Sequence, residues 1–276
     1  MSELLQDRDR YIDAFAAFVG ESPSSFHAAE AVARTLERAG FARHRETEAW
    51  APIAADSAGV VVRDGAVIAW RAGTEPSATS PVRILGTHTD SPGFVLKPRP
   101  DFTTEGWAQV GVEIYGGPLL NSWLDRDLGL AGRIVTGDGS EHLVRTRAVA
   151  RIPQLAIHLD REVNAGLVLE RQRHMQPVIG VEVPGSTPVL SLLAEATEPP
   201  SGFAVDAPAT HPADIVGMDV RLVETQPPAR IGAAGELFAS PRLDNLSSVF
   251  AGLVALLDAE PAPGEIAMFA AFDHEE

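Results

Sequence analysis

Three short polar segments of the sequence together offer the side chains that a hydrolytic metal site needs. They are His88-Thr89-Asp90, Asp244-Asn245 and Asp273-His274-Glu275-Glu276. Histidine nitrogen and carboxylate oxygen suit zinc or a similar divalent ion, and an aspartate can bridge two such ions. A glutamate beside a ligand glutamate is placed to act as general base when water attacks an amide. The three segments together therefore predict metal-assisted amide hydrolysis.

Each segment taken alone also has an ordinary structural explanation. A His-x-Asp sequence followed by Pro92 and Gly93 is typical of a surface turn, and an Asp-Asn pair often caps a helix. A Glu-Glu pair is most often a solvated charge run. The functional interpretation thus depends on the three segments meeting in space.

The secondary structure predicted around the three polar segments indicates that the segments lie close together. Residues 82–86 form a short core strand and residues 266–272 a buried one, and both run directly into polar segments. In open α/β sheets, ligands bind beyond the carboxyl ends of the strands. Asp244 stands near the start of a helical pattern at 240–260, where an acidic residue is favourable.

The remaining patterns indicate how the chain is organised. Helical spacing at 3–20 is followed by a second helix, capped by Ser24 or Ser25, and by a hairpin that turns at Asp64-Gly65. From about 100 to 230, short β-like runs prevail. Helix-and-strand segments on both sides of a β-rich middle predict an α/β domain interrupted by an inserted one.

Within the β-rich middle, residues 194–213 are rich in Ala, Pro, Thr and Ser. Such a composition is typical of a long exposed loop.

The composition excludes several classes of protein. The chain has 22 Lys and Arg against 38 Asp and Glu, a formal net charge of −16, which argues against a nucleic-acid partner. It has no cysteine, so disulfides, thiolate zinc sites and cysteine nucleophiles are excluded. No signal peptide and no membrane span are recognisable, and we expect a cytoplasmic protein without a membrane partner. The absence of a G-x-S-x-G elbow and of phosphate-binding glycine motifs disfavours serine hydrolases and nucleotide-binding enzymes.

Longer motifs carry a resemblance to a known family. The sequences "GTHTDSP", "WLDRDLGLAGR", "RIPQLAIHLDREVN", "SPRLDNLSS" and "FDHEE", in this order, resemble the aspartyl aminopeptidase family of two-metal metallopeptidases. The resemblance implies an α/β catalytic domain, at 1–98 and 231–276, split by a β-rich dimerisation domain at 99–230. It also implies removal of N-terminal Asp or Glu from peptides, and dimer-based homo-oligomers, typically dodecamers. The implied cofactors are two divalent ions, zinc or alternatively manganese or cobalt.

The resemblance also implies roles for single residues. His88, Asp244 and Glu276 match metal ligands, with Asp244 as the bridging one. Asp90 matches the aspartate that orients the first histidine, and Glu275 matches the general base. His158 matches a substrate-binding histidine that reaches into the active site of a neighbouring subunit.

Two departures from the family pattern affect these expectations. His274 stands where an asparagine is expected. The family continues beyond Glu-Glu with a further acidic ligand and a late histidine ligand, so the catalytic domain looks incomplete at its C-terminus. We therefore expect the 276 residues alone to be inactive, to bind metal weakly, and to leave the final strand with an uncovered surface and an unpaired edge. The alternative to an aminopeptidase is a catalytically inactive fragment or homologue that retains only an oligomerisation role.

Overall fold

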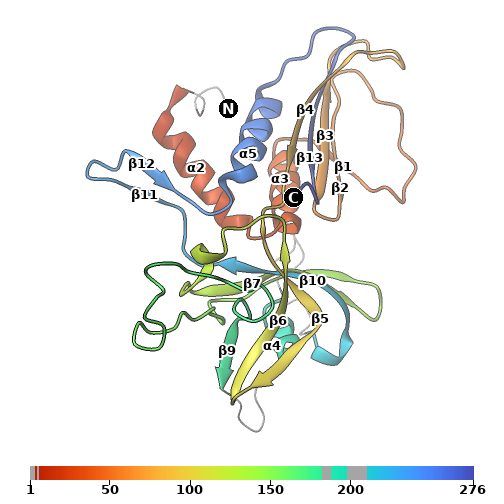
Figure 1. The fold of residues 1–276 in the computed structure, drawn as a ribbon. Coiled ribbons are helices and arrows are strands. Elements are labelled where there is room, and N and C mark those ends of the chain that lie inside the picture. The colour runs from red at the N-terminus through yellow and green to blue at the C-terminus, as the bar shows by residue number, and fades with distance from the viewer. Residues whose placement is uncertain (1–3, 5, 182–187, 198–209) are drawn as a thin grey trace. The chain divides into compact units, whose positions relative to one another are not determined.

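The chain divides into two compact units, and the first of them combines sequence from both sides of the second. The computed structural model describes residues 4, 6–181, 188–197 and 210–276. The first unit consists of Met1–Ser91 and Pro227–Glu275, and the second of Pro92–Gln226 together with Glu276. Figure 1 shows the helices and strands of each unit.

A five-stranded sheet forms the centre of the first unit. Its order is β1-β2-β3-β13-β4, in which β13 pairs antiparallel with β3 and parallel with β4. The strands are β1 (Ala42–His44), β2 (Ala58–Arg63), β3 (Ala66–Ala72), β4 (Val82–His88) and β13 (Ile266–Phe272). The predicted hairpin turning at Asp64-Gly65 is present as β2 and β3, with Asp64 at φ 53°.

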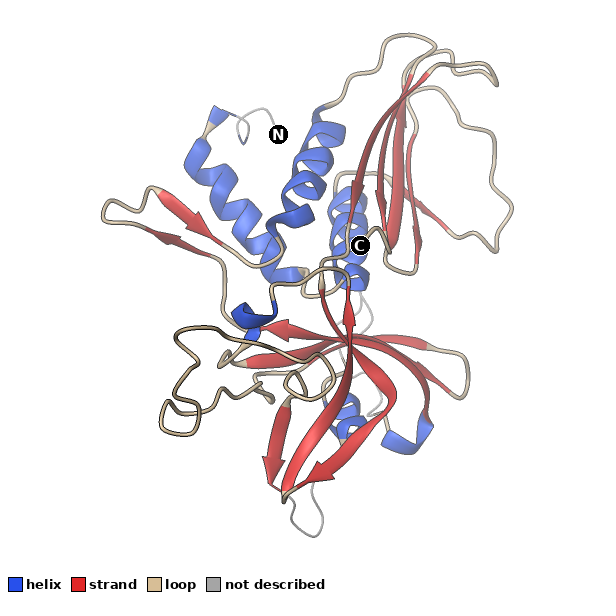
Figure 2. Ribbon diagram, viewed as in Figure 1, coloured by secondary structure: helices blue, strands red, loops and turns tan. Residues whose placement is uncertain are grey.

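Three helices, α2 (Arg8–Glu21), α3 (Ser25–Arg38) and α5 (Leu243–Asp258), pack with this sheet around one apolar core (Figure 2). Helix α2 begins at Arg8, where the side chain of Asp7 accepts hydrogen bonds from the amides of Asp9 and Arg10 and caps it. Residues 4 and 6, within the helical stretch predicted from residue 3, are also helical. Ser24 is the residue before α3, as predicted, and its side chain accepts from the His27 amide. The predicted α/β fold class is confirmed.

The predictions for β4 and for the last strand are wrong in one respect each. β4 is not a core strand: Val82, Ile84 and Leu85 are 42%, 61% and 52% exposed. β13, in turn, has no unpaired edge, since β3 and β4 flank it and Phe269 is fully buried. An apolar run indicates a strand but not its position in the sheet, and here β4, like β1, lies at an edge.

Helix α5 approaches β13 through a glycine, which gives a stability prediction. A Cβ on Gly252 would meet the ring of the fully buried Phe269, with 2.6 Å to Cδ2. Overpacking of this kind costs about 1–3 kcal/mol, while the better helix propensity of alanine returns at most about 1 kcal/mol. Gly252→Ala should therefore lower the free energy of unfolding measured in urea. Gly20→Ala in α2 is the control, because no atom lies within 4 Å of its added Cβ; equal effects of the two substitutions would contradict the packing argument.

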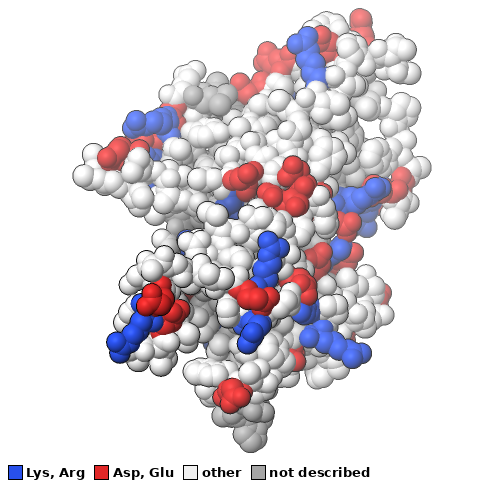
Figure 3. All heavy atoms as spheres, viewed as in Figure 1, with Lys and Arg blue, Asp and Glu red and all other residues white. Residues whose placement is uncertain are grey.

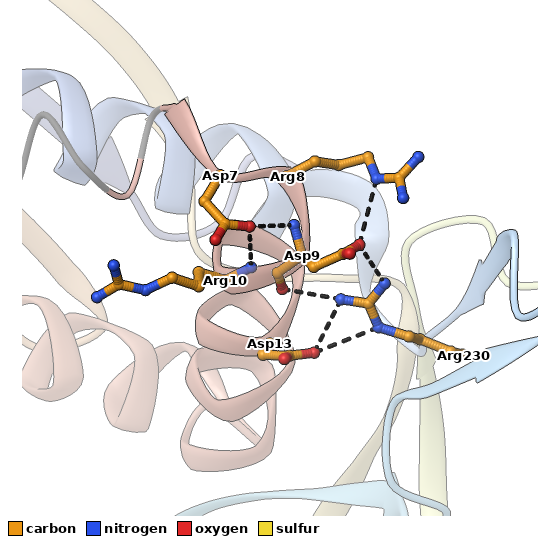
Figure 4. A network of polar contacts seen from close by, with 6 residues as sticks. All are labelled: Asp7, Arg8, Asp9, Arg10, Asp13 and Arg230. Atoms are coloured by element: carbon orange, nitrogen blue, oxygen red, sulfur yellow. Dashed lines mark hydrogen bonds and ion pairs between the residues drawn. The ribbon is translucent and has the colours of Figure 1, made fainter.

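A small hairpin is tied to helix α2 by one arginine. Its strands are β11 (Ala229–Ile231) and β12 (Leu237–Ala239). The Arg230 guanidinium donates to the carboxylates of Asp9 and Asp13 and to the carbonyl of Asp9, at 2.8–3.3 Å (Figure 4). The hydrogen bond from Arg230 lowers the pKa of Asp9. These charged groups join the segment that precedes Asp244 to helix α2.

The second unit is built on an antiparallel six-stranded sheet in the order β8-β7-β10-β5-β6-β9. Its strands are β5 (Gly93–Thr104), β6 (Trp107–Tyr115), β7 (Leu128–Thr136), β8 (Glu141–Arg145), β9 (Val178–Val181) and β10 (Ile215–Glu224). Its core includes Phe94, Leu130, Ile134 and Leu222, all at most 2% exposed. The β-rich character predicted for the middle of the chain is therefore present.

The loop predicted at 194–213 has regular structure at both ends. Its first residues belong to helix α4 (Val189–Glu195) and its last residues to a 3-10 turn (Pro212–Asp214), while residues 198–209 lie outside the described part of the chain. Among the described residues, no helix has the length and apolar character needed to cross a membrane.

Candidate metal centre

The parallel pairing of β4 and β13 brings two of the polar segments to one end of the sheet. The strands run in register, with His88 opposite Phe272. Beyond them, the amide of Thr89 donates to the carbonyl of Phe272 at 2.8 Å. The segments at 88–90 and 273–276 therefore leave the sheet side by side.

His88 is held with one ring nitrogen toward its own loop. Its Nδ1 hydrogen-bonds to the backbone carbonyl of Asp90 at 3.1 Å and lies 3.4 Å from the Asp90 carboxylate. The Asp90 side chain is completely buried. A proton on Nδ1 shared with Asp90 leaves Nε2 as the free acceptor, which is the arrangement usual for metal-binding histidines.

Asp244 approaches the other ring nitrogen. Its Oδ1 lies 3.3 Å from His88 Nε2, and its side chain is 80% exposed. The backbone of Asp244, at φ −84° and ψ 112°, is not helical, and Arg242 just before it adopts a left-handed conformation. Asp244 thus lies in the first turn of α5, as predicted, but an irregular backbone there presents its carboxylate.

The two final glutamates complete the group. Glu275 Oε2 lies 3.7 Å from His88 Nε2. One possible ligand atom from each of His88, Asp244 and Glu276 lies within 4.8 Å of the others. In Figure 3 acidic side chains gather where the chain ends in Figure 1. One imidazole nitrogen and two carboxylates at this separation form a donor set that suits a divalent ion such as zinc.

His274 occupies a turn position that explains why an asparagine is expected there. Its φ is 66°, in the left-handed region that asparagine and histidine adopt more readily than most residues. His274→Asn should therefore leave zinc affinity unchanged, whereas the β-branched His274→Val should strain the turn by about 1–2 kcal/mol. We expect the valine variant alone to bind zinc more weakly in a titration with a competing chelator. Equal zinc affinities of the two variants would show that the backbone conformation at this position is unimportant.

His158, the sixth candidate, lies in the second unit. It is an exposed residue in a turn of the long segment between Ile152 and β9. The structure brings the other five candidates together. Four of them lie at the end of the sheet of the first unit, and the fifth, Glu276, directly follows Glu275.

Two further residues support the site and received no role from the sequence. Ser91 Oγ donates to the backbone carbonyl of Asp244 at 2.8 Å, which joins the loop after β4 to the first turn of α5. The buried hydroxyl of Thr89 donates to the Gly65 carbonyl at 2.6 Å. Both lie within the "THTDSP" sequence, and their place in that motif was the only signal of a role.

Comparison with known proteins gives the family. A family model described as aminopeptidase I zinc metalloprotease (M18) matches residues 18–276. A probable M18 family aminopeptidase 2 of Streptomyces coelicolor is 45% identical over 271 residues, which are 96% of this chain and 60% of that protein. The chain spans less than two thirds of the length of this and other curated relatives that it matches.

Solved structures agree with the assignment. A chain in a cryo-EM structure of the Ape4 and Nbr1 complex superimposes with a TM-score of 0.86 at 31% identity, over 96% of this chain and 54% of that one. A structure of mApe1 from Chaetomium thermophilum superimposes with a TM-score of 0.81 at 27% identity, over 97% of this chain and 63% of that one. With a family model that matches nearly the whole chain, this protein belongs to the M18 family of peptidases.

Proposed function

We propose that the protein is a zinc-dependent aminopeptidase that removes N-terminal Asp or Glu from peptides and uses two metal ions. The observation that carries the proposal is the group formed by His88, Asp244 and Glu276, with Glu275 beside it. The family model, described as a zinc metalloprotease, supports both the reaction class and the metal. The acidic substrate preference rests on the resemblance of the motifs to aspartyl aminopeptidases.

The chain's own residues divide the work of amide hydrolysis. Bound zinc would act as a Lewis acid that favours deprotonation of water and polarises the scissile carbonyl. His88, Asp244 and Glu276 would hold it, and Asp90 would keep the His88 ring in the required tautomer. Glu275 would take a proton from the attacking water and pass it to the leaving amine.

The number of donors limits what these residues do by themselves. A two-metal site needs roughly three or four donors for each ion, counting water and a shared carboxylate. The group found among the described residues has three. We therefore expect residues 1–276 alone to bind zinc weakly and to hydrolyse peptides slowly or not at all.

The test compares two proteins: residues 1–276, and the product of the complete reading frame. Each is assayed with zinc, manganese or cobalt on matched peptides that begin with Asp, Glu, Asn, Leu or Lys. The proposal expects the product of the reading frame to release N-terminal Asp and Glu preferentially, and a chelator to stop the release. Preference for Leu or Lys would contradict the acidic specificity, and chelator-insensitive release would contradict the metal mechanism.

The second unit supports a further part of the proposal, self-association. Its long segment around His158 exposes Leu155, Ile157, Leu159 and Val168 by 61%, 51%, 68% and 84%. Large apolar side chains exposed together typically mark a protein interface. We propose that a second copy of the chain covers them, and that His158 then serves the active site of that copy.

Replacing His158 tests whether this residue acts in the active site of a neighbouring subunit. The variant is made in whichever of the two proteins compared above shows peptidase activity. There, His158→Ala should lower kcat while the zinc content stays unchanged, because no proposed zinc ligand is removed. Mixing this variant with Asp244→Ala should restore part of the activity, since hybrid dimers would contain one intact site. Demonstrated hybrid formation without any recovery would show that His158 does not act in the neighbouring subunit.

A protein that only associates is the second candidate function. The exposed apolar side chains around His158 favour it, because they do not depend on the metal group. Association that persists in the absence of any metal-dependent hydrolysis by the product of the complete reading frame would favour this candidate.

A further inference from the structure

Asp273 is a buried carboxylate next to the proposed base and ligand, and it has no role in the scheme above. Its side chain is only 4% exposed, whereas that of Glu275, two residues later, is 61% exposed. Its Oδ1 accepts from the amide of His274 at 2.9 Å, and its Oδ2 from the hydroxyl of Ser25 at 3.0 Å. Burying a carboxylate is unfavourable unless such donors compensate it.

The contacts of Asp273 fix the turn that carries the two glutamates. The bond to the His274 amide holds the backbone in its left-handed conformation, directly before Glu275. The bond to Ser25 attaches the same turn to the first residue of helix α3. Because α3 is packed in the core of the first unit, this attachment is to a rigid element.

The turn between β2 and β3 closes around the same carboxylate. A Cβ on Gly65 would collide with Asp273 Oδ2 and would lie 2.6 Å from Ser25 Oγ. The carbonyl of Gly65 accepts from the hydroxyl of Thr89, which also lies 3.1 Å from the Phe272 carbonyl. Gly65 thus lies against Asp273 on one side and bonds the loop of His88 and Asp90 on the other.

We propose that Asp273 is a positioning residue for the metal centre: together with Ser25 and Gly65 it fixes the turn before Glu275 and Glu276 relative to the loop that carries His88. The inference rests on the proposed function for what the site binds. The contacts of Asp273 themselves do not depend on a metal. Asp273 would not bind the ion, because its oxygens accept from Ser25 and His274.

The experiment uses the 276-residue protein and three variants. Asp273→Ala removes both acceptors. Asp273→Asn retains them in part, because its carbonyl can accept from the His274 amide while its NH2 group donates to Ser25 Oγ. Glu48→Ala removes an exposed carboxylate and serves as the control. Hydrogen exchange of segments 86–92 and 272–276 is measured without metal, and cobalt affinity is measured by the absorption spectrum of the bound ion.

We expect Asp273→Ala to exchange severalfold faster in both segments and to bind cobalt at least about tenfold more weakly, as for other residues that orient metal ligands. Asp273→Asn and Glu48→Ala should stay close to the parent protein. A lower melting temperature of Asp273→Ala with unchanged exchange in both segments and unchanged cobalt affinity would overturn the inference, since Asp273 would then only stabilise the fold. A parent protein that binds no cobalt would instead count against the proposed metal site, and the exchange measurement would still decide the role of Asp273.

Discussion

Asp244→Ala is expected to weaken zinc binding by the 276-residue protein by at least about 100-fold. Removing residues that merely orient metal ligands already costs about 10–100-fold in affinity, and Asp244 is proposed as one of the three donors found among the described residues. Its carboxylate is 80% exposed and lies 3.3 Å from His88 Nε2, so the substitution removes a donor without opening a cavity. The fold should therefore survive, and loss of binding can be read as loss of the ligand.

The measurement is a zinc titration against a chelator of known affinity, with the circular dichroism spectrum as a check on folding. Asp258→Ala is the matched control, because Asp258 is an exposed aspartate at the other end of the same helix. His88→Ala should behave as Asp244→Ala does. Unchanged zinc affinity in a folded Asp244→Ala protein would remove Asp244 from the site and with it the bridging role.

The second prediction with a large effect concerns Glu275, the proposed general base. Glu275→Gln in the catalytically active protein should lower kcat by about 10²–10⁴-fold, the usual contribution of a positioned general base. Glutamine keeps the size and hydrogen-bonding capacity of the side chain but cannot take a proton from water. Zinc content should stay close to that of the parent, because the proposed ligand is Glu276 and not its neighbour.

Zinc content and kcat must be measured on the same preparation for this comparison to be decisive. Glu260→Gln, an exposed glutamate just after helix α5, is the control for a change of charge alone. Retained turnover with retained zinc would show that another group takes the proton. Loss of zinc together with turnover would make Glu275 a ligand, and the assignments of Glu275 and Glu276 would have to be exchanged.

The meeting of the polar segments could be predicted from the sequence because strands leave a local signal. The apolar runs before His88 and Asp273 have strand character, and the carboxyl ends of neighbouring parallel strands lie at the same edge of a sheet. The neighbours of a strand leave no such signal. For this reason the sequence gives no indication that β13 lies between β3 and β4, or that Ile84 is exposed.

The supporting contacts could not be predicted for a related physical reason. The Asp273 carboxylate is bound by Ser25, a residue near the other end of the chain, and Ser91 binds a backbone carbonyl. Residue type indicates which side chains can donate or accept but not which partner the fold provides. The irregular turn at Asp244 was missed because an acidic residue before a helical pattern equally well indicates a simple helix start.

The position of β13 has a consequence for the order in which the protein folds. Residues 82–88 and 266–272 pair along their whole length, although Pro92–Gln226 of the second unit lie between them in the sequence. Closing so long a loop is slow, since its entropy must be lost before any contact compensates for it. During synthesis on the ribosome, β3 and β4 would wait without their common neighbour until the inserted unit had emerged. The proposed metal ligands would then assemble among the last contacts to form, and zinc uptake would report that folding of the first unit is complete.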